Sequence, residues 1–481
     1  MREFFRIVVV ALAVAASIAC NREVYMPQVE EIVSDSARYV MPESHYGISA
    51  DTASAARIKR YDFYTDRHLR QIIDTALAAN PSIRIAVLQI EEAEAYFRRS
   101  RRERLPEVTA DLSASYTDAG YGRAPMEDHL FRLGASWEID IWGRIKSLRK
   151  AQAHKLMQSV AAANAVRTRI IADAAALYYR LIILDARRIS VEQSISRNDS
   201  IVTGCNILID AAAWEKSDGE KRAKLLPHAQ MVREQAASEL YASKAELPDI
   251  EAEIFITQNT LNRLLGRTDG ELPRSSVEKV FEQSMFRDSI AVGIPAQLLR
   301  NRPDIIAAEE QLFSDYDLTR AAQAALYPRL TLKGDVGLET RSMAHWFDLP
   351  SALLYNAFAG LTQPLFRRGE LRMQRRVREV RQSVSFMRLR DAVLAAQCEV
   401  SNTMMRYASA RRRVIIYYSQ VGSLRQAMAH ARQLMSSGGS YLDVWAAQTR
   451  LLQAEKNLYN AMLTMFDQRI ALYRELGGGW R

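Results

Sequence analysis

Residues 108–116 read VTADLSASY, so apolar and polar side chains alternate strictly along this segment. A period of two is typical of a β-strand whose two faces meet different surroundings. Three later segments alternate in a similar way, the last of them less cleanly. Each spans about ten residues, the length at which a tilted strand crosses a bilayer. A soluble sandwich with one buried face would give the same pattern. We expect the four strands at about 107–117, 129–141, 329–340 and 352–363.

The N-terminus predicts export and a lipid anchor. Arg2 and Arg6 flank the start of an apolar run, 7–16, which is too short to span a bilayer and is typical of a secretory signal peptide. Ser17-Ile18-Ala19 then leads into Cys20, and small residues directly before a cysteine resemble the bacterial lipobox. We expect cleavage before Cys20 and lipid on its thiol, with an ordinary signal peptide as the alternative. An export signal favours a membrane location for the four strands.

Composition excludes several classes of protein. The chain has 481 residues, of which 48% are hydrophobic and 25% are charged, and these globular values exclude bulk disorder. Three cysteines cannot make a disulfide framework. No apolar stretch beyond the N-terminus reaches the roughly 18–20 residues that a transmembrane helix needs, which excludes a multi-helix membrane protein. The formal net charge of +9 only weakly favours an anionic partner.

The two halves of the chain repeat one pattern. Pro303 stands 222 positions after Pro81, and Pro328 stands 222 positions after Pro106. In each half we expect a helix between the two prolines, because the residue before a proline is disfavoured in a helix. Two strands follow, and a glycine, which tolerates backbone angles that other residues avoid, precedes a long helix. The expected strand–helix junctions are Pro106, Gly143, Pro328 and Gly369.

Long helices are expected after the strands. Residues 144–203, 370–421 and 440–476 contain neither glycine nor proline. Sixty helical residues would extend over about 90 Å. We expect turns between antiparallel helices at Gly204 and at Gly438-Gly439. The predicted organisation is a signal peptide at 1–19, a lipidated segment at 20–60, a first repeat at 61–280 and a second repeat at 281–481.

Four strands cannot close a barrel on their own. An open sheet edge in lipid leaves backbone N–H and C=O groups unpaired, at a cost of several kcal/mol each. The smallest common closed barrels have about eight strands, so several chains would have to share one barrel. Three chains would supply enough strands to enclose a lumen, although the strand pattern does not choose among two, three and four chains.

Several short motifs, in their order along the chain, resemble those of TolC-type outer-membrane efflux proteins. The most similar subgroup is that of the lipoproteins serving resistance–nodulation–division (RND) pumps. The resemblance runs from about residue 60 to the C-terminus. It is carried by WEIDIWGR (137–144), LLRNRPDI (298–305), YPRLTL (327–332), QPLF (363–366) with Gly369, YLDV (441–444) with Gln448 and Leu451, and LGGGW (476–480).

The resemblance implies a membrane α+β fold. Three chains, with four strands each, would form a trimeric twelve-stranded β-barrel, continued by a long antiparallel α-helical tunnel in the periplasm. Each chain would carry an internal two-fold repeat. The implied function is that of an outer-membrane channel in a tripartite efflux system, without enzymatic activity. A type I protein secretion channel is one alternative, and a coiled-coil scaffold lipoprotein without a pore is another.

The resemblance also implies the partners. They are two further copies of the chain, a periplasmic adaptor (membrane fusion protein), an inner-membrane RND transporter and the lipid of the outer membrane. Nucleic acid is not among them, and the lipid on Cys20 is the one covalent group expected. The seven histidines show no metal-ligand spacing, and no nucleophile–base pair stands out, so we predict neither a metal site nor a cofactor.

A channel of this kind is expected to close at the helix ends far from the membrane. These ends should lie near 436–442 and between 204 and 227. A lumenal carboxylate would appear three times in a trimer, and such a ring favours cations. Asp443 is the first gate candidate, followed by Asp218 and Glu215. The alternative for each is a solvated carboxylate near a helix start.

The chain departs from its relatives at this end. Ala446 stands where relatives often carry an acid, and Ser436-Ser437 stands where they often carry a Tyr-Arg pair. The ion-pair lock of those relatives is therefore not transferred to this chain.

The densest basic run comes directly before the first strand. Its members are Arg98, Arg99, Arg101, Arg102 and Arg104. Export argues against nucleic-acid binding by this run. A solvated helix face is the simplest interpretation, and contact with lipid phosphates at the membrane rim is the alternative.

Overall fold

The computed structural model describes residues 60–118, 126–214, 219–285, 301–341, 352–436 and 441–480. The described chain packs into two compact units, each built from both halves of the sequence. The first unit comprises the described parts of Ala86–Ala163 and Asp304–Val393. The second comprises 60–85 and the described parts of Asn164–Pro303 and Leu394–Arg481.

Each half of the chain contains a helix, two strands and two long helices in this order, and the first half has further short helices. The elements are α3 (Arg60–Phe63), α4 (Arg67–Ala79), α5 (Pro81–Arg102), β1 (Glu107–Thr117), β2 (Met126–Ile139), α6 (Arg144–Trp214), α7 (Gly219–Leu264), α8 (Val277–Met285), α10 (Pro303–Ala324), β3 (Arg329–Thr340), β4 (Leu353–Thr362), α11 (Glu370–Ser436) and α12 (Tyr441–Glu475).

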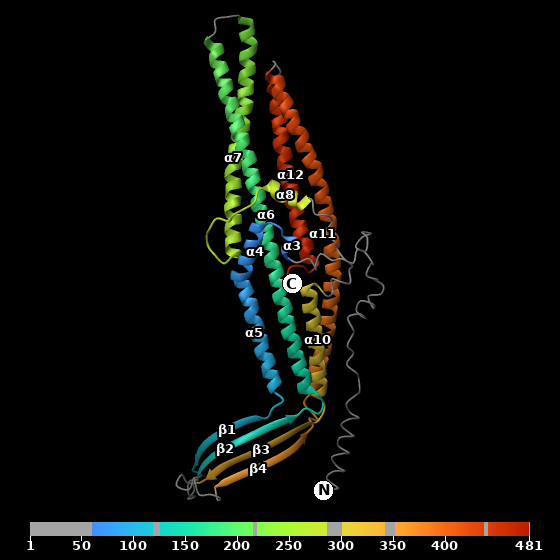
Figure 1. Cartoon of the computed structure of the whole chain (residues 1–481). Helices are drawn as coiled ribbons and strands as arrows, with labels where there is room; N and C mark the ends of the chain where they lie inside the picture. The colour runs from blue at the N-terminus through green and yellow to red at the C-terminus, as the bar shows by residue number, and fades with distance from the viewer. Residues whose placement is uncertain are drawn as a thin grey trace. The chain divides into compact units, whose positions relative to one another are not determined.

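The first unit contains the sheet (Figure 1). Its four strands lie in chain order, β1-β2-β3-β4, and every neighbouring pair is antiparallel. Within the described residues, β1 pairs only with β2 and β4 only with β3, so each outer strand has one unpaired edge. The same unit includes α10 and the parts of α5, α6 and α11 nearest in sequence to the strands.

The second unit is a bundle of long helices with an apolar core. α6 and α7 run antiparallel, as do α11 and α12 (Figure 1). Aromatic rings hold the core together: Phe63 stacks on Tyr473 with ring centroids 4.0 Å apart, and Tyr179 stacks on Phe466 at 4.6 Å. Such stacked pairs contribute about 0.5–1.5 kcal/mol beyond the apolar area that they bury.

The turn expected at Gly204 was wrong, because α6 continues through this residue to Trp214. α11 likewise continues through Gly422. One glycine in a helix interior costs about 1 kcal/mol relative to alanine, less than the packing of neighbouring helices can supply. Gly438 and Gly439 lie outside the described residues, between the end of α11 and the start of α12.

The C-terminal end of α12 is closed by a glycine turn. The Gly478 N–H donates to the Tyr473 carbonyl at 3.0 Å, and the Gly477 N–H donates to the Arg474 carbonyl at 2.9 Å. Gly477 has φ of 83°, which together with these bonds makes a Schellman motif. A Cβ atom on Gly477 would lie 2.3 Å from the Asn301 carbonyl oxygen. Both the backbone angle and the close approach therefore require glycine at this position.

Replacing Gly477 by alanine is expected to destabilise the protein by about 2 kcal/mol or more, because left-handed strain and steric overlap add together. Gly204→Ala is the matched control, since a Cβ there has nothing within 4 Å. This second change should leave stability unchanged or raise it by up to about 1 kcal/mol. Thermal unfolding of the detergent-solubilised protein, followed by circular dichroism, measures both. A Gly204→Ala variant that melts well below the wild type would contradict the continuous α6.

Candidate functional site

The strand register gathers apolar side chains on one face of the sheet. Residues directly opposite each other in antiparallel strands share a face. Leu112 is opposite Phe131, and Leu133 is opposite Val336, which in turn is opposite Tyr355. This face is uncovered within the described chain, as the exposed fractions of Leu112 (75%) and Tyr355 (77%) show. It is therefore built to meet an apolar environment outside the chain.

The opposite face of the sheet is largely polar. Asp111 is opposite Arg132, and their side chains form an ion pair at 3.4 Å. Asp335 is opposite Asn356, whose amide donates to the carboxylate at 2.9 Å. Its apolar members are Phe358, opposite Lys333, Leu130, opposite Ser113, Met126, opposite Thr117, and Leu354, opposite Gly337. One polar and one apolar face on the same sheet is the arrangement of a wall between water and hydrocarbon.

Trp142 ties the two halves of the chain together beside the sheet. Its indole N–H donates to the Pro328 carbonyl at 2.8 Å, and its ring stacks on Tyr327 with centroids 4.7 Å apart. Trp142 lies between β2 and α6, whereas Tyr327 and Pro328 lie between α10 and β3. The WEIDIWGR and YPRLTL motifs therefore meet in one contact.

The start of α6 is fixed by the same motif. The Glu138 carboxylate receives two hydrogen bonds from the Arg144 guanidinium, at 2.8 and 2.9 Å. The Asp140 carboxylate accepts the backbone N–H groups of Ile145, at 3.1 Å, and Lys146, at 2.7 Å. A carboxylate at this place satisfies N–H groups that a helix start leaves unpaired and complements the positive end of the helix dipole.

The four expected junction residues all lie between a helix and a strand. Pro106 directly precedes β1, and Pro328 directly precedes β3. Gly143, with φ of 73°, directly precedes α6, and Gly369, with φ of 79°, directly precedes α11. Arg368 beside it has φ of 50°, which is uncommon for a residue other than glycine.

Two further motifs contact each other in the second unit. The indole N–H of Trp480, from LGGGW, donates to the carbonyl of Asn301, from LLRNRPDI, at 3.0 Å. Arg302 pairs with Glu399 at 2.8 Å and lies 3.4 Å from the Glu475 carbonyl, to which it donates. The C-terminus is thereby fastened to the segment that leads into α10.

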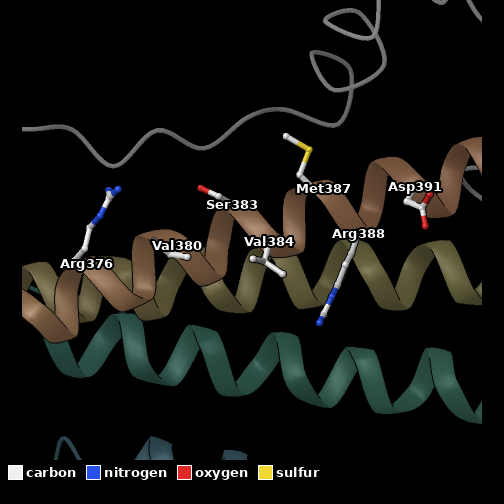
Figure 2. Close-up of a pocket in the computed structure, with 7 residues that line it drawn as sticks. All are labelled: Arg376, Val380, Ser383, Val384, Met387, Arg388 and Asp391. Atoms are coloured by element: carbon white, nitrogen blue, oxygen red, sulfur yellow. The ribbon is translucent and has the colours of Figure 1, made fainter.

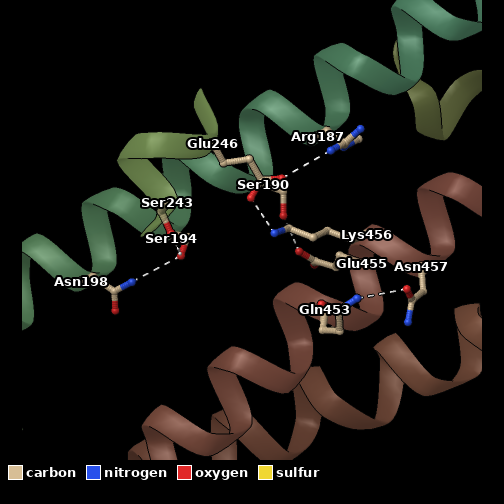
Figure 3. A network of polar contacts seen from close by, with 10 residues as sticks. All are labelled: Arg187, Ser190, Ser194, Asn198, Ser243, Glu246, Gln453, Glu455, Lys456 and Asn457. Carbon is tan, nitrogen blue, oxygen red and sulfur yellow. Dashed lines mark hydrogen bonds and ion pairs between the residues drawn. The ribbon is translucent and has the colours of Figure 1, made fainter. Parts of the chain in front are cut away.

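A polar network crosses the helix bundle of the second unit (Figure 3). The buried Glu455 carboxylate on α12 accepts a hydrogen bond from the Ser190 hydroxyl on α6 at 2.6 Å, and it pairs with Arg425 on α11 at 3.0 Å. Glu246 on α7 pairs with Lys456 on α12 at 2.5 Å. Because each of these charged groups has a partner on another helix, the network fixes which helix positions face each other.

Burial also changes the acidity of carboxyl groups in the helices. Desolvation raises the pKa of Asp467 on α12 to about 6, although Arg180 opposes the shift. Desolvation also raises the pKa of Asp317 on α10, against Lys150, His154 and Arg320. The His154 Nε2 atom lies 3.7 Å from the Asp317 carboxylate.

An apolar stripe on α11 is left uncovered by the rest of the described chain. Val380, Val384 and Met387 are 47%, 43% and 57% exposed, and their spacing of three or four residues puts them on one side of the helix. With Arg376 and Arg388 they line a groove of about 570 Å³ (Figure 2). All described residues that line the groove belong to α11.

The gate candidate Asp443 is exposed in the first turn of α12. Nearby in sequence, the buried Gln448 side chain donates to Asn198 on α6 at 3.0 Å. The other two gate candidates, Asp218 and Glu215, and the lipidation candidate Cys20 lie outside the described residues. No helix in the described ranges is both long and apolar enough to cross a membrane. Nor do the described residues group three His, Cys, Asp or Glu side chains as metal ligands.

Residues 72–203 and 294–478 match the family described as outer membrane efflux protein. The chain belongs to this family. The resemblance found in the sequence motifs is thus confirmed, and the protein is an outer-membrane efflux protein.

Individual members of the outer membrane efflux protein family align with nearly the whole chain. The cation efflux system protein CusC of Escherichia coli O6:H1 is 25% identical over 87% of this chain and 88% of its own length. The probable outer membrane lipoprotein SilC of Salmonella typhimurium is 24% identical over 87% of each chain. The open-state structure of the Neisseria gonorrhoeae outer membrane channel MtrE superimposes with a TM-score of 0.80, at 24% identity, over 90% of this chain and 94% of that one.

The contribution of the Trp142 contacts with Tyr327 and Pro328 to stability can be tested directly. Trp142→Phe keeps a ring against Tyr327 but removes the donor to Pro328, and the loss of one such hydrogen bond costs about 1 kcal/mol. We expect a lower melting temperature by circular dichroism. Tyr327→Phe, which retains the stacked ring and the indole bond, is the control and should melt like the wild type. Equal melting of Trp142→Phe and wild type would mean that these contacts contribute nothing.

Proposed function

We propose that three copies of this chain form one channel, each contributing its four strands to a twelve-stranded barrel in the outer membrane. The helices continue the channel as a tunnel through the periplasm. Substrates pass through it without chemical change, delivered by an inner-membrane RND transporter and a periplasmic adaptor.

The unpaired edges of the sheet carry this proposal. In lipid, each unpaired backbone N–H or C=O group costs several kcal/mol, so β1 and β4 need partners. Four alternating strands make β4 of one copy antiparallel to β1 of the next, so the seam between copies repeats the pairing within a copy. Two copies would give eight strands, whose interior side chains fill, whereas about twelve enclose a lumen.

The two faces of the sheet support the same assembly. The face with Leu112, Leu133 and Tyr355 would contact hydrocarbon, and the face with Asp111, Arg132 and Asp335 would line the lumen. Outside the sheet, the exposed stripe of Val380, Val384 and Met387 on α11 would be covered by a helix of the neighbouring copy.

Element bounds support an internal two-fold repeat. α10 begins at position 303, which is 222 after the start of α5 at 81, and it ends at 324, which is 222 after the end of α5 at 102. β3 begins at 329, again 222 after β1 at 107. In this proposal the first repeat covers 61–280 and the second covers 281–481, and the trimer has six similar sectors.

The N-terminal segment would anchor each copy by lipid on Cys20. SilC, a relative of similar length, is named a probable outer membrane lipoprotein. Several acyl chains on one cysteine hold a protein firmly at a membrane, since each buried CH₂ contributes about 0.8 kcal/mol. The names of the relatives favour an efflux role: CusC belongs to a cation efflux system.

Assembly and conduction test the proposed function together. The full-length protein in mild detergent is expected to migrate as a trimer on unheated gels and as a monomer after heating. In planar bilayers it should give discrete conductance steps. A protein that is monomeric, water-soluble without detergent and electrically silent would contradict the proposal.

A gate role for Asp443 is a separate prediction. Three copies of this exposed carboxylate would form a ring at the helix end, and a ring of negative charge favours cations. Asp443→Ala is expected to lower the cation-to-anion permeability ratio in planar bilayers. The control is Asp269→Ala, which removes an exposed carboxylate from the segment after α7. An unchanged ratio in Asp443→Ala would remove this residue from the gate.

A further inference from the structure

A basic cavity lies beside the strand–helix junctions of the first unit. Its volume is about 460 Å³, and its walls come from the start of α6, the end of α10, the start of β3, and α11 with the turn before it. Among the described residues, no aspartate or glutamate lines it. The arginines that line it are Arg144, Arg329, Arg367, Arg378 and Arg381.

Three of these arginines have no acidic partner among the residues that the structure describes. Arg144 is paired with Glu138 at 2.8 Å, and Arg367 lies 3.8 Å from Glu370. Arg329, Arg378 and Arg381 form no ion pair with any described residue of the chain. The cavity therefore concentrates positive charge that the surrounding residues leave uncompensated.

Arg329 adds an unmet hydrogen-bond donor. Its Nε atom is buried and has no hydrogen-bond partner within the described chain. Leaving a buried donor without an acceptor is costly, and more so when the donor is charged. An acceptor that enters the cavity would remove this cost.

The positions on α11 bring further donors to the same place. Gln374, Arg378 and Arg381 are spaced by four and three residues, so their side chains lie on one face of the helix. α11 begins at Glu370, and the positive end of its dipole adds to the potential of the arginines. Guanidinium groups match phosphate oxygens in pairs, because their donors form a planar fork.

The rest of the cavity wall is apolar. Leu148 on α6, Leu318 on α10, and Met373 and Val377 on α11 line it together with small alanine side chains. A free inorganic anion would leave these side chains without a contact. An anion attached to a hydrocarbon chain would use both parts of the wall.

We propose that this cavity binds the phosphate group of a phospholipid. Arg329, Arg378 and Arg381 bind the phosphate oxygens, and Leu148, Leu318 and Met373 contact the glycerol and the first part of an acyl chain. The lipid source rests on the proposed placement of the sheet in the outer membrane, with the helices on the periplasmic side. In that placement the cavity lies at the depth of the inner-leaflet headgroups.

Lipid binding by the purified full-length trimer tests the site. Native mass spectrometry with dioleoyl phosphatidylglycerol as the probe is expected to show bound lipid on the wild type, and about tenfold weaker binding to Arg329→Gln/Arg378→Gln/Arg381→Gln. The matched control is Arg411→Gln/Arg412→Gln/Arg413→Gln, which removes the same charge from α11 outside the cavity. It should bind lipid like the wild type. Equal binding by all three proteins would overturn the proposal.

Arginine modification gives a second measurement that needs no variant. Phenylglyoxal labelling of the wild type, quantified by peptide mass spectrometry, should slow at Arg329, Arg378 and Arg381 when phosphatidylglycerol is present and remain unchanged at Arg411–Arg413. Protection by inorganic phosphate but not by lipid would overturn the lipid assignment in favour of a soluble anion. Protection by neither would overturn the site.

Failure of the lipid-binding proposal can be distinguished from failure of the proposed channel function. Conductance and gel migration of the cavity variant report on assembly, and lipid binding reports on the cavity. A variant that still conducts as a trimer but loses phosphatidylglycerol supports the cavity as a lipid site distinct from the pore.

Discussion

Backbone hydrogen bonding at the edges of the sheet is the constraint on which the rest of this protein depends. Among the described residues of one chain, β1 and β4 each have one unpaired edge. In lipid, unpaired backbone N–H and C=O groups cost several kcal/mol each. In the proposed channel, copies of the chain supply one another with the missing backbone partners. The exposed apolar side chains on the strands and on α11 are consistent with the same proposal.

Several of the motifs that carry the family resemblance form hydrogen bonds between segments distant in sequence. WEIDIWGR meets YPRLTL through Trp142 and Pro328, and LGGGW meets LLRNRPDI through Trp480 and Asn301. The amide of Gln363, from QPLF, donates to the Leu326 carbonyl at 2.9 Å. In each of these contacts, a planar side-chain N–H group donates a hydrogen bond to a backbone carbonyl. Such a bond fixes the orientation of the two segments and buries little apolar area.

The sequence predicted those features that depend on local patterns. Alternation along 108–116 is a local property of the chain, and β1 occupies that segment. The turn expected at Gly204 failed because packing against neighbouring helices, which no local pattern reports, outweighs the low helix propensity of one glycine. Ser190 and Glu455 are 265 residues apart and of ordinary types, so nothing in the sequence marks them as partners. Likewise, Arg329 is far in sequence from Arg378 and Arg381, so no local pattern marks the three as neighbours. A ring of Asp443 side chains would belong to an assembled trimer, so it is a property that a single chain does not carry.

The contact made by Trp142 has a mechanical consequence. It locks the exit of β2 to the entrance of β3, two segments whose backbones are already hydrogen-bonded side by side along their length. The Trp142 bond and the backbone hydrogen bonds between the strands together oppose spreading or sliding of β2 against β3. In the proposed channel, widening would then come from movement of the helices, with the strands as the fixed part of the wall.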